Sequence, residues 1–285
     1  MYRFVRHWAK LALEALLKSE EGPNDGKKAK GSSDCFACED CKDPGTPSTT
    51  VYRCCDCFQP SIQCKRCILN EHIKMPFHFV CEWKRDERFW SRKALTSLGV
   101  VINLGHGGSP CPSHTRPPRA FTIVSQHGIH HLSVQFCECK GEKSVPESIQ
   151  LVRAGLWPST WDRPATAFTV PTLKDFDHLA HQCHVNAYDF YWYLRRKTDN
   201  IARKDVVVRA VTACTLGRGL TSSMQDRYDE FIMAVRLFNH VTMVKRHRAD
   251  IDNLGYASLA VICPMCPRID QNMDPAWRKR DKKLR

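Results

Sequence analysis

Residues 54–78 read CCDCFQPSIQCKRCILNEHIKMPFH, and cysteines and histidines recur through this stretch in spaced pairs. Two residues between paired cysteines allow one tight turn to present both thiolates to a single tetrahedral Zn²⁺, with Zn–S distances of about 2.3 Å. With one more cysteine pair upstream, four pairs supply ligands for two closed structural sites. The pairs are Cys35 and Cys38, Cys54 and Cys57, Cys64 and Cys67, and His72 and His78.

These pairs are expected to interleave, so that each zinc joins segments that are far apart in the sequence. One zinc would be held by the first and third pairs, Cys35, Cys38, Cys64 and Cys67. The other would be held by the second and fourth pairs, Cys54, Cys57, His72 and His78. Two choices stay open, because Cys41 follows Cys38 at the same spacing and Cys55 could replace either neighbouring cysteine.

The composition predicts a basic surface. Lysine and arginine number 43 against 30 aspartates and glutamates, which gives a formal net charge of +13, and bound thiolates offset part of this excess. A positive surface favours polyanions, chiefly nucleic acid, through counterion release. The 285 residues are enough for about two domains with a buried core.

Cysteine usage and hydropathy restrict the compartment. Sixteen cysteines without a secretory signal indicate the cytosol or the nucleus, where thiols bind metal rather than form disulfides. No apolar run approaches the roughly 18 residues of a membrane span, so no membrane partner is expected.

Residues 3–20 are predicted to form an amphipathic helix, because Phe4, Trp8, Leu11 and Ala15 share one helical face. This face is expected to pack on the rest of the protein. Residues 21–33 are rich in glycine, lysine and serine and read as a flexible linker. A short helix is predicted over residues 86–98.

A second constellation of cysteines and histidines surrounds a predicted hairpin, whose strands are residues 120–125 and 129–137. Strand alternation places His131 on the same side as Cys137 and Cys139 and His130 on the opposite side. A third zinc fits this constellation, with Cys111, Cys137 and Cys139 as the best ligands. The full set is His106, Cys111, His130, His131, Cys137 and Cys139.

Helices are predicted after residue 146, and the aromatic run near residue 190 is expected to be core rather than a base-stacking platform. The predicted helices are residues 146–154, 171–183, 186–197 and 221–248. Near the end, Cys263 and Cys266 form half of a metal site, for which Cys183, His184 and Cys214 are the available partners.

Several basic residues are candidate contacts to DNA phosphates, although basic helix ends are also common without a ligand. They are Arg195, Arg196, Lys197, Lys245, Arg246, Arg248, Arg278, Lys279 and Arg280.

The fold expected from these patterns is α+β, with a small zinc module and a zinc-bound hairpin followed by a mostly α-helical region. The expected boundaries are 1–33 for the helix and linker, 34–82 for the zinc module and 83–145 for the second cluster. Residues 146–262 form the helical region and 263–285 the CPMCP motif with a basic tail.

Within the first module, YRCCDC at 52–57, CKRC at 64–67 and the two histidines resemble the ZZ-type zinc finger, with looser kinship to B-box modules. ZZ-type fingers recognise peptide tails, so the resemblance implies an alternative function as a peptide-docking module. Asp40, Asp43, Asp56 and Glu71 could line an acidic pocket for such a peptide.

Further blocks extend from about residue 30 to Trp277. They are YRCCDC at 52–57, LGHGGSPC at 104–111, GIH at 128–130, CEC at 137–139, PST at 158–160, RPATAF at 163–168, YDFY at 188–191, TDN at 198–200 and CPMCP at 263–267. Together they resemble the CxC-type cysteine cluster associated with fungal Kyakuja-Dileera-Zisupton (KDZ) transposases. The histidine of GIH belongs to that family's motif, so the resemblance favours His130 as a ligand, against the strand argument.

The resemblance also implies that an RNase H-like catalytic domain with acidic metal ligands begins after Trp277, where only eight residues follow. Strand transfer needs several carboxylates around two Mg²⁺ ions. We therefore expect no enzyme activity in this chain, but a nuclear, zinc-binding region with two or three Zn²⁺ that binds DNA at transposon ends or in chromatin, or docks proteins. A ubiquitin-ligase component and a decayed remnant are the remaining alternatives.

Overall fold

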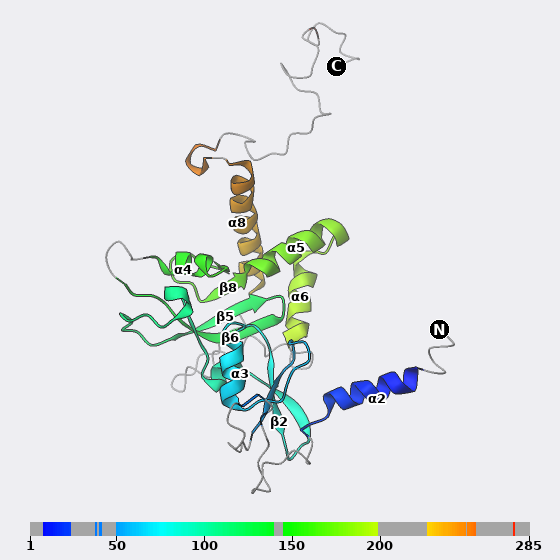
Figure 1. The fold of residues 1–285 in the computed structure, drawn as a ribbon. Helices are drawn as coiled ribbons and strands as arrows, with labels where there is room; N and C mark the ends of the chain where they lie inside the picture. The colour runs from blue at the N-terminus through cyan, green and yellow to red at the C-terminus, as the bar shows by residue number, and fades with distance from the viewer. Residues whose placement is uncertain are drawn as a thin grey trace, which may run out of the picture. The chain divides into compact units, whose positions relative to one another are not determined.

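The computed structural model describes residues 8–23, 38, 40–41, 50–139, 145–198, 227–248, 250–254 and 276 (Figure 1). Its contacts divide the chain into two units, residues 1–236 and 237–285. Helices and two β-sheets together make it an α+β protein, as the sequence predicted. No helix in the described ranges is long and apolar enough to cross a bilayer.

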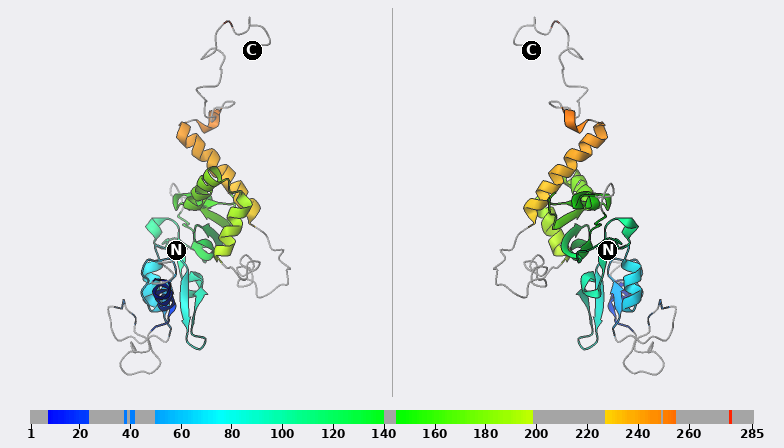
Figure 2. Two further views of the ribbon diagram at one scale, coloured as in Figure 1. Left: turned by 90° about the vertical axis from the view of Figure 1, so that its right-hand side faces the viewer. Right: turned by 90° about the vertical axis from the view of Figure 1, so that its left-hand side faces the viewer.

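The smaller sheet is antiparallel; it begins in the predicted zinc module, residues 34–82, and extends past its expected boundary to residue 93. Its strands, in the order β1-β2-β3, are β1 (Tyr52–Cys54), β2 (Val80–Lys84) and β3 (Phe89–Lys93). Helix α3 (Lys65–His72) packs beside β1, and Figure 2 shows the β2–β3 hairpin from two further sides. The module thus has one short helix and one hairpin.

The prediction of a helix over residues 86–98 is wrong. Residues 89–93 form β3, because Trp90 pairs with Trp83 of β2 across the hairpin and aromatic residues stabilise such cross-strand pairs. Only Leu95–Leu98 winds into a 3₁₀-helix, η2, which buries both leucines. It ends at Gly99, whose φ of 98° suits glycine.

The larger sheet has five strands in the order β4-β6-β5-β8-β7. The predicted hairpin is confirmed as its centre, where β5 and β6 pair antiparallel, while β4 is parallel to β6 and β8 is parallel to β5. The strands are β4 (Val101–Asn103), β5 (Arg119–Ser125), β6 (Gly128–Gln135), β7 (Leu156–Pro158) and β8 (Thr166–Thr169).

Strands β7 and β8 correct the expectation that the chain after residue 146 is mostly helical. Both join the hairpin's sheet, and β8 is completely buried in the pattern TAFT. The second cluster and the first part of the helical region therefore share one sheet and one core, since Val134, Leu151, Leu156 and Ala167 belong to the same hydrophobic cluster.

Four of the predicted helices are present, each close to its expected range: α4 (Glu147–Arg153), α5 (Val170–Cys183), α6 (Ala187–Thr198) and α8 (Tyr228–His247). Thr169 caps α5 by accepting a hydrogen bond from the Thr172 amide, and Pro171 lies in its first turn. Helix α6 packs on β6, and α5 packs on β5 and β8.

The aromatic run of α6 is largely core, as expected. Phe190 and Tyr191 are buried, and both rings stack on Phe231 of α8, with centroids 5.8 and 6.0 Å apart. Phe176 of α5 joins them at 5.3 Å from Phe231. Tyr188 and Tyr193, in contrast, are half exposed. The second unit contains the end of α8 and the 3₁₀-helix η5 (Ile251–Asn253).

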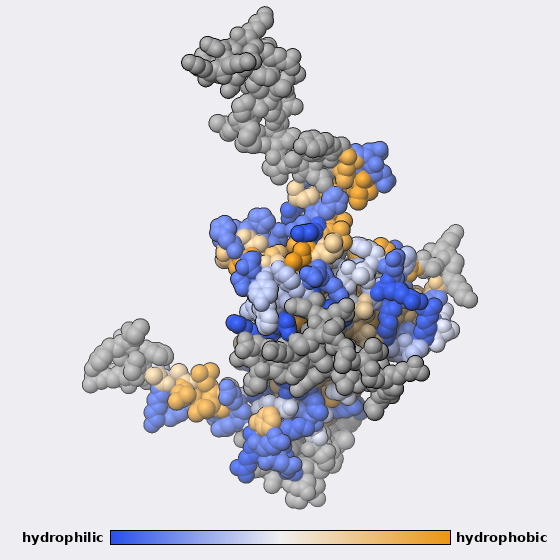
Figure 3. Space-filling view, turned by 180° about the vertical axis from the view of Figure 1, so that it is seen from behind, coloured by the Kyte–Doolittle hydropathy of each residue, from blue (hydrophilic) through white to orange (hydrophobic). Residues whose placement is uncertain are grey.

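The amphipathic N-terminal helix is present as α2 (Ala9–Glu20). The prediction that its apolar face packs on the rest of the protein is wrong. None of its residues is buried, and Trp8, Leu11 and Leu16 are 58%, 56% and 63% exposed. Figure 3 shows an orange, hydrophobic patch on the exposed surface of α2. Contacts to the rest of the first unit come from the end of the helix, described below.

Candidate metal centres

The described residues contain three groups of four cysteine or histidine side chains whose ligand atoms lie within 4.8 Å of one another. The first group is Cys38, Cys41, Cys64 and Cys67. The second is Cys54, Cys57, His72 and His78. The third is His106, Cys111, Cys137 and Cys139.

The first group is built on the beginning of α3. Cys64 is the residue before the helix and Cys67 lies in its first turn, so both thiols lie at the helix start, where a negative charge is favoured. The Cys64 amide donates to Cys38 Sγ at 3.2 Å. Cys41 Sγ lies 3.6 Å from both Cys64 Sγ and Cys67 Sγ. Cys41, the alternative left open above, is thus a member of this group, and Cys35 lies outside the described residues.

The second group joins the end of β1 to the end of α3 and has the composition that the sequence predicted. Cys54 Sγ is 3.5 Å from His78 Nδ1, and Cys57 Sγ is 3.5 Å from His72 Nε2 and 3.4 Å from His78 Nδ1. Helix α3 carries members of the first group at its start and His72 at its end. The ligands of the two groups therefore interleave along the chain.

A hydrogen bond fixes the orientation of His72. Its Nδ1–H donates to the carbonyl of Ile68, one turn earlier in α3, at 3.0 Å. Because Nδ1 carries this proton, Nε2 keeps a free lone pair that faces Cys57. The imidazole is buried, with 0% of its surface exposed, so the ring is held in the geometry of a metal ligand.

The third group lies where two parallel strands end at the same edge of the larger sheet. Asn103 of β4 pairs with Gln135 of β6, so the residues that follow each strand meet. His106 follows β4 and Cys137 follows β6, and His106 Nε2 lies 3.2 Å from Cys137 Sγ and 3.4 Å from Cys139 Sγ. Cys111 Sγ is 3.8 Å from both cysteine sulfurs.

A glycine-rich loop brings His106 to these sulfurs. Residues 105–108 all have positive φ, between 46° and 91°, a conformation that glycine adopts without steric cost. Gly105 also lies against Cys137, where an added Cβ would stand 3.1 Å from the Cys137 Cβ. The three glycines of Gly-His-Gly-Gly therefore suit the backbone conformation of this loop.

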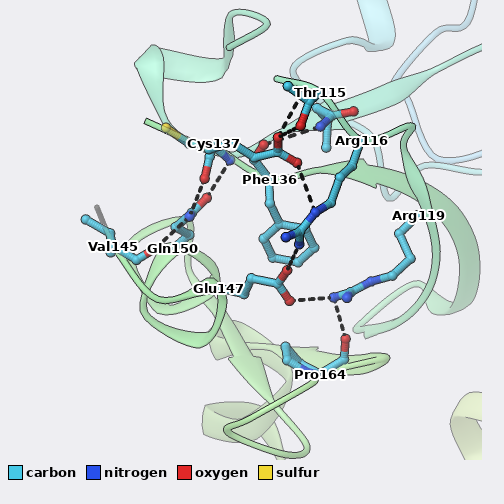
Figure 4. A network of polar contacts seen from close by, with 11 residues as sticks. Thr115, Arg116, Arg119, Phe136, Cys137, Val145, Glu147, Gln150 and Pro164 are labelled. Atoms are coloured by element: carbon cyan, nitrogen blue, oxygen red, sulfur yellow. Dashed lines mark hydrogen bonds and ion pairs between the residues drawn. The ribbon is translucent and has the colours of Figure 1, made fainter. Parts of the chain in front are cut away.

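Two polar contacts hold the cysteine end of β6 (Figure 4). Gln150 of α4 accepts a hydrogen bond from the Cys137 amide and donates to the Cys137 carbonyl, at 2.8 and 3.0 Å. The carboxylate of Glu138 accepts hydrogen bonds from the amide and hydroxyl of Thr115 at 2.8 and 2.6 Å. The bonds of Glu138 join the loop after Cys111 to the segment that carries Cys137 and Cys139, and those of Gln150 join the same segment to α4.

The distances between ligand atoms fit a tetrahedral metal. With Zn–S near 2.3 Å and Zn–N near 2.0–2.1 Å, a tetrahedron has S–S edges of about 3.8 Å and S–N edges of about 3.5 Å. The S–S separations of 3.6–3.8 Å are much longer than a disulfide bond of about 2.05 Å. Each of the three groups could therefore hold one metal ion.

The acidities of the thiols are also suited to a cation. The amide of Glu138 is the main cause that lowers the pKa of Cys111 to about 6. The thiol of Cys137 beside it raises the pKa of Cys139, and the thiol of Cys38 raises that of Cys41. Crowded thiols thus oppose full ionisation, and a bound dication would remove this opposition.

His130, expected as a ligand from the family motif, is not part of the third group. Its ring is buried and stacks on Phe79 at 4.6 Å, and its Nε2 shares a hydrogen bond with Ser125 Oγ at 2.9 Å. Burial lowers the pKa of His130 to about 3, so the ring is neutral. His131 is not in the group either, and Thr122 Oγ1 lies 3.3 Å from its Nδ1. The fourth position belongs to His106.

Of the expected phosphate contacts, Arg195 is 4% exposed and its guanidinium lies 4.4 Å from the centroid of the Trp192 ring. Burial removes Arg195 from any DNA-facing surface. Lys197 Nζ donates to the Gln126 carbonyl at 2.9 Å. Arg196, Lys245, Arg246 and Arg248 are exposed. Cys263, Cys266, Arg278, Lys279 and Arg280 lie outside the described residues.

Residues 95–202 match a protein-family model whose description is "CxC2 like cysteine cluster associated with KDZ transposases". The match contains the complete third group and the larger sheet. It begins after the first two groups, which lie within residues 38–78. The chain matches no curated protein and no solved structure. Residues 95–202 thus form a cysteine-cluster region similar to those associated with KDZ transposases.

Proposed function

We propose that this chain is a zinc-stabilised region of a KDZ-transposase-type protein that binds DNA in the nucleus. The observation that carries the zinc assignment is the set of three four-donor groups with tetrahedral separations. Thiolate and imidazole donors suit Zn²⁺, whereas Mg²⁺ prefers oxygen. Four protein donors in each group leave no open position for a reacting water, which favours a structural over a catalytic role.

Bound zinc would supply folding free energy to loops that bury little apolar surface. Cys64 and Cys67 would be held to the segment of Cys38 and Cys41, and the Gly-His-Gly-Gly loop to the end of β6. Native mass spectrometry of protein purified without chelator tests this assignment. Three zinc ions per chain are expected, with loss of helical signal on chelation; a folded chain without metal would refute it.

DNA binding is supported by the net charge of +13 and by the exposed basic end of α8. The chain from Phe231 to Arg248 has three arginines and one lysine but no acidic residue, so nothing within this stretch offsets the positive charge. Contacts to phosphates release counterions, so affinity falls steeply with salt. Titration of a fluorescent duplex between 50 and 200 mM salt is the direct test, and an affinity that is unchanged by salt would refute phosphate contact.

We propose that strand transfer is not carried out by this region. All three donor groups of the described residues consist of cysteine and histidine, whereas strand transfer uses carboxylates around two metal ions. Incubating the chain with plasmid DNA and Mg²⁺ should give no nicking. Metal-dependent nicking that survives further purification would overturn this part of the proposal.

A second candidate function is the docking of a peptide, and one cavity favours it. A pocket of about 630 Å³ beside the first group is lined by Asp40, Ser61, Gln63 and Glu71, among others. The Gln63 amide donates to Asp40 at 2.6 Å and to Glu71 at 2.5 Å, and the hydrogen bond from Ser61 lowers the pKa of Asp40. A carboxylate that is ionised at neutral pH suits a cationic peptide group.

Asp40 and Glu71, two of the four acidic residues named above for such a pocket, both line this cavity. Asp56 does not, because its carboxylate accepts the Phe79 amide and faces His127, and Asp43 lies outside the described residues. Peptide docking can be distinguished from DNA binding by measuring the affinity for one peptide with a free N-terminus and with an acetylated N-terminus. Tight, salt-resistant binding of the free amine, without DNA affinity, would favour docking.

A further inference from the structure

One face of the smaller sheet carries two tryptophans and an arginine. Arg53 of β1 lies opposite Cys81 of β2, and Trp83, two residues further, lies opposite Trp90 of β3. Since side chains alternate along a strand, Arg53, Trp83 and Trp90 share this face. The two indole rings are 5.2 Å apart, and the Arg53 guanidinium lies 4.4 Å from the Trp90 ring centroid. We call these three residues the Trp–Arg face.

The chain's own segment Ser19–Gly22 lies on the Trp–Arg face, at the end of α2. Arg53 Nη1 donates to the Ser19 carbonyl at 2.7 Å, and Trp90 Nε1 donates to the Glu21 carbonyl at 3.2 Å. Both acceptors are main-chain atoms, and carbonyls at the end of a helix need such partners. The face therefore binds the backbone of a peptide, in addition to packing against it.

Gly22 makes this contact selective. A Cβ at Gly22 would stand 2.1 Å from Trp83 Cζ2 and 2.3 Å from Cη2. These distances are far below van der Waals contact, and the obstacle is a rigid indole rather than a flexible chain end. Glycine is thus the residue that fits against Trp83 while the two carbonyls keep their donors.

Charge adds a second element of selectivity. The strand register places Arg53, Cys81, Trp83, Trp90 and Arg92 on this face, so it has two positive charges and no negative charge. The segment that covers it contains Glu20 and Glu21 before Gly22. Glu82, the acidic residue of β2, has the opposite orientation and pairs with Lys84 and Lys93 at 3.0 Å. The face and its covering segment are complementary in charge.

We propose that the Trp–Arg face is a binding site for acidic peptide segments that carry a glycine directly after their acidic residues, presented by a partner protein. The segment Ser19–Gly22 fills this site in cis and competes with the partner. A covalently attached segment has an effective concentration in the millimolar range, so a partner peptide binds well only when the segment is displaced. Displacement also releases α2, whose apolar side chains are already exposed.

The test uses the full chain with Gly22→Val, which places a side chain against Trp83 and removes the segment from the face. The probe is a fluorescent peptide of residues 8–23, followed by anisotropy. We expect the peptide to bind Gly22→Val at least tenfold more tightly than the unaltered chain. Ala12→Val, at an exposed position of α2, is the matched control and should behave as the unaltered chain.

Two further comparisons define the result. Adding Trp90→Phe to Gly22→Val should weaken peptide binding, because a phenyl ring keeps an aromatic surface but lacks the indole N–H donor. Equal binding to Gly22→Val and to the unaltered chain, or no saturable binding, would overturn the proposal. A single-stranded oligonucleotide that competes with the peptide and gains more affinity than the peptide from Gly22→Val would also overturn it and make the tryptophans a base-stacking surface.

Folding is checked by metal content and circular dichroism. If Gly22→Val does not fold, Arg53→Gln and Trp90→Phe are compared in the otherwise unaltered chain. Loss of either donor should release the segment and accelerate tryptic cleavage after Lys18 severalfold relative to Arg88→Gln, at an exposed position of the β2–β3 turn. An unchanged cleavage rate in both variants would overturn the proposal.

Discussion

Gln150 binds both main-chain polar groups of Cys137, accepting from its amide at 2.8 Å and donating to its carbonyl at 3.0 Å. The same side-chain amide also donates to the Val145 carbonyl at 2.8 Å. A single buried residue of α4 thereby fixes the backbone that directs the Cys137 thiolate towards His106. The geometry of the third group therefore depends on a residue that is not itself a ligand.

The first prediction concerns this residue. Gln150→Leu removes the side-chain partner of the half-buried Cys137 amide and carbonyl, at a cost of at most about 1–3 kcal/mol for each group. We expect the metal affinity of the third group to fall by about 10–100-fold, as for other residues that orient ligands. Competition with a chromophoric chelator measures this, and one of three metal ions should be lost first.

Ile149→Ala is the matched control, because Ile149 lies on the same helix and is 37% exposed. It should leave the three metal affinities unchanged. If Gln150→Leu retained all three with unaltered affinity, the orienting role of Gln150 would be wrong.

The second prediction separates Cys41 from its neighbours. Cys41 Sγ lies 3.6 Å from two other sulfurs of the first group, so Cys41→Ser should reduce the metal count from three to two. Cys55→Ser should keep three, because Cys55 belongs to none of the three groups. Cys35→Ser should also keep three, because the first group has four ligands without it. Native mass spectrometry gives the count, and three metal ions in Cys41→Ser would exclude Cys41 as a ligand.

The third prediction follows from the buried His130. Its pKa is about 3 in the folded chain and about 6.5 in the unfolded chain. Below pH 6.5 the unfolded chain binds the extra proton, so the free energy of unfolding falls as the pH decreases. At pH 5.5 this single group costs about 1.4 kcal/mol relative to neutral pH.

His130→Gln lacks this ionisation, and Gln can still bond Ser125. Its stability relative to the unaltered chain should therefore improve by about 1.4 kcal/mol between pH 7.5 and 5.5, as measured by urea unfolding with excess zinc. Acid effects on the thiolates are common to both proteins and cancel in the difference. His240→Gln, at an exposed position, should show no such improvement; a His130→Gln difference that does not change with pH would exclude a depressed pKa.

The fourth prediction distinguishes two adjacent arginines of α6. Arg196 is exposed, whereas Arg195 is buried. If α6 contacts DNA, Arg196→Ala should lower the affinity and reduce the salt slope by about one with little loss of stability. Arg195→Ala should instead lower the unfolding midpoint, since it removes a buried side chain that packs on Trp192. An unaltered affinity in Arg196→Ala would remove α6 from the DNA-binding surface.

Local patterns predicted much of this protein correctly. Cysteine spacing identified the complete second group and the interleaving of the first two, because two-residue spacing is a property of one turn of chain. Helical periodicity located α4, α5, α6 and α8, and alternation located the β5–β6 hairpin, because these signals depend on neighbouring residues alone.

The tertiary structure decided what depends on distant partners. Residues 86–98 were expected to be helical, but the pairing of Trp90 with Trp83 favours a strand. His130 has the right chemistry for a ligand, yet it packs on Phe79, while His106 reaches the cysteines because β4 and β6 are parallel and end together. Which side chains can bind metal follows from the residue types alone, since this is a property of their donor atoms. Which of them meet depends on folding, since strand pairing and burial bring together residues that are far apart in the chain.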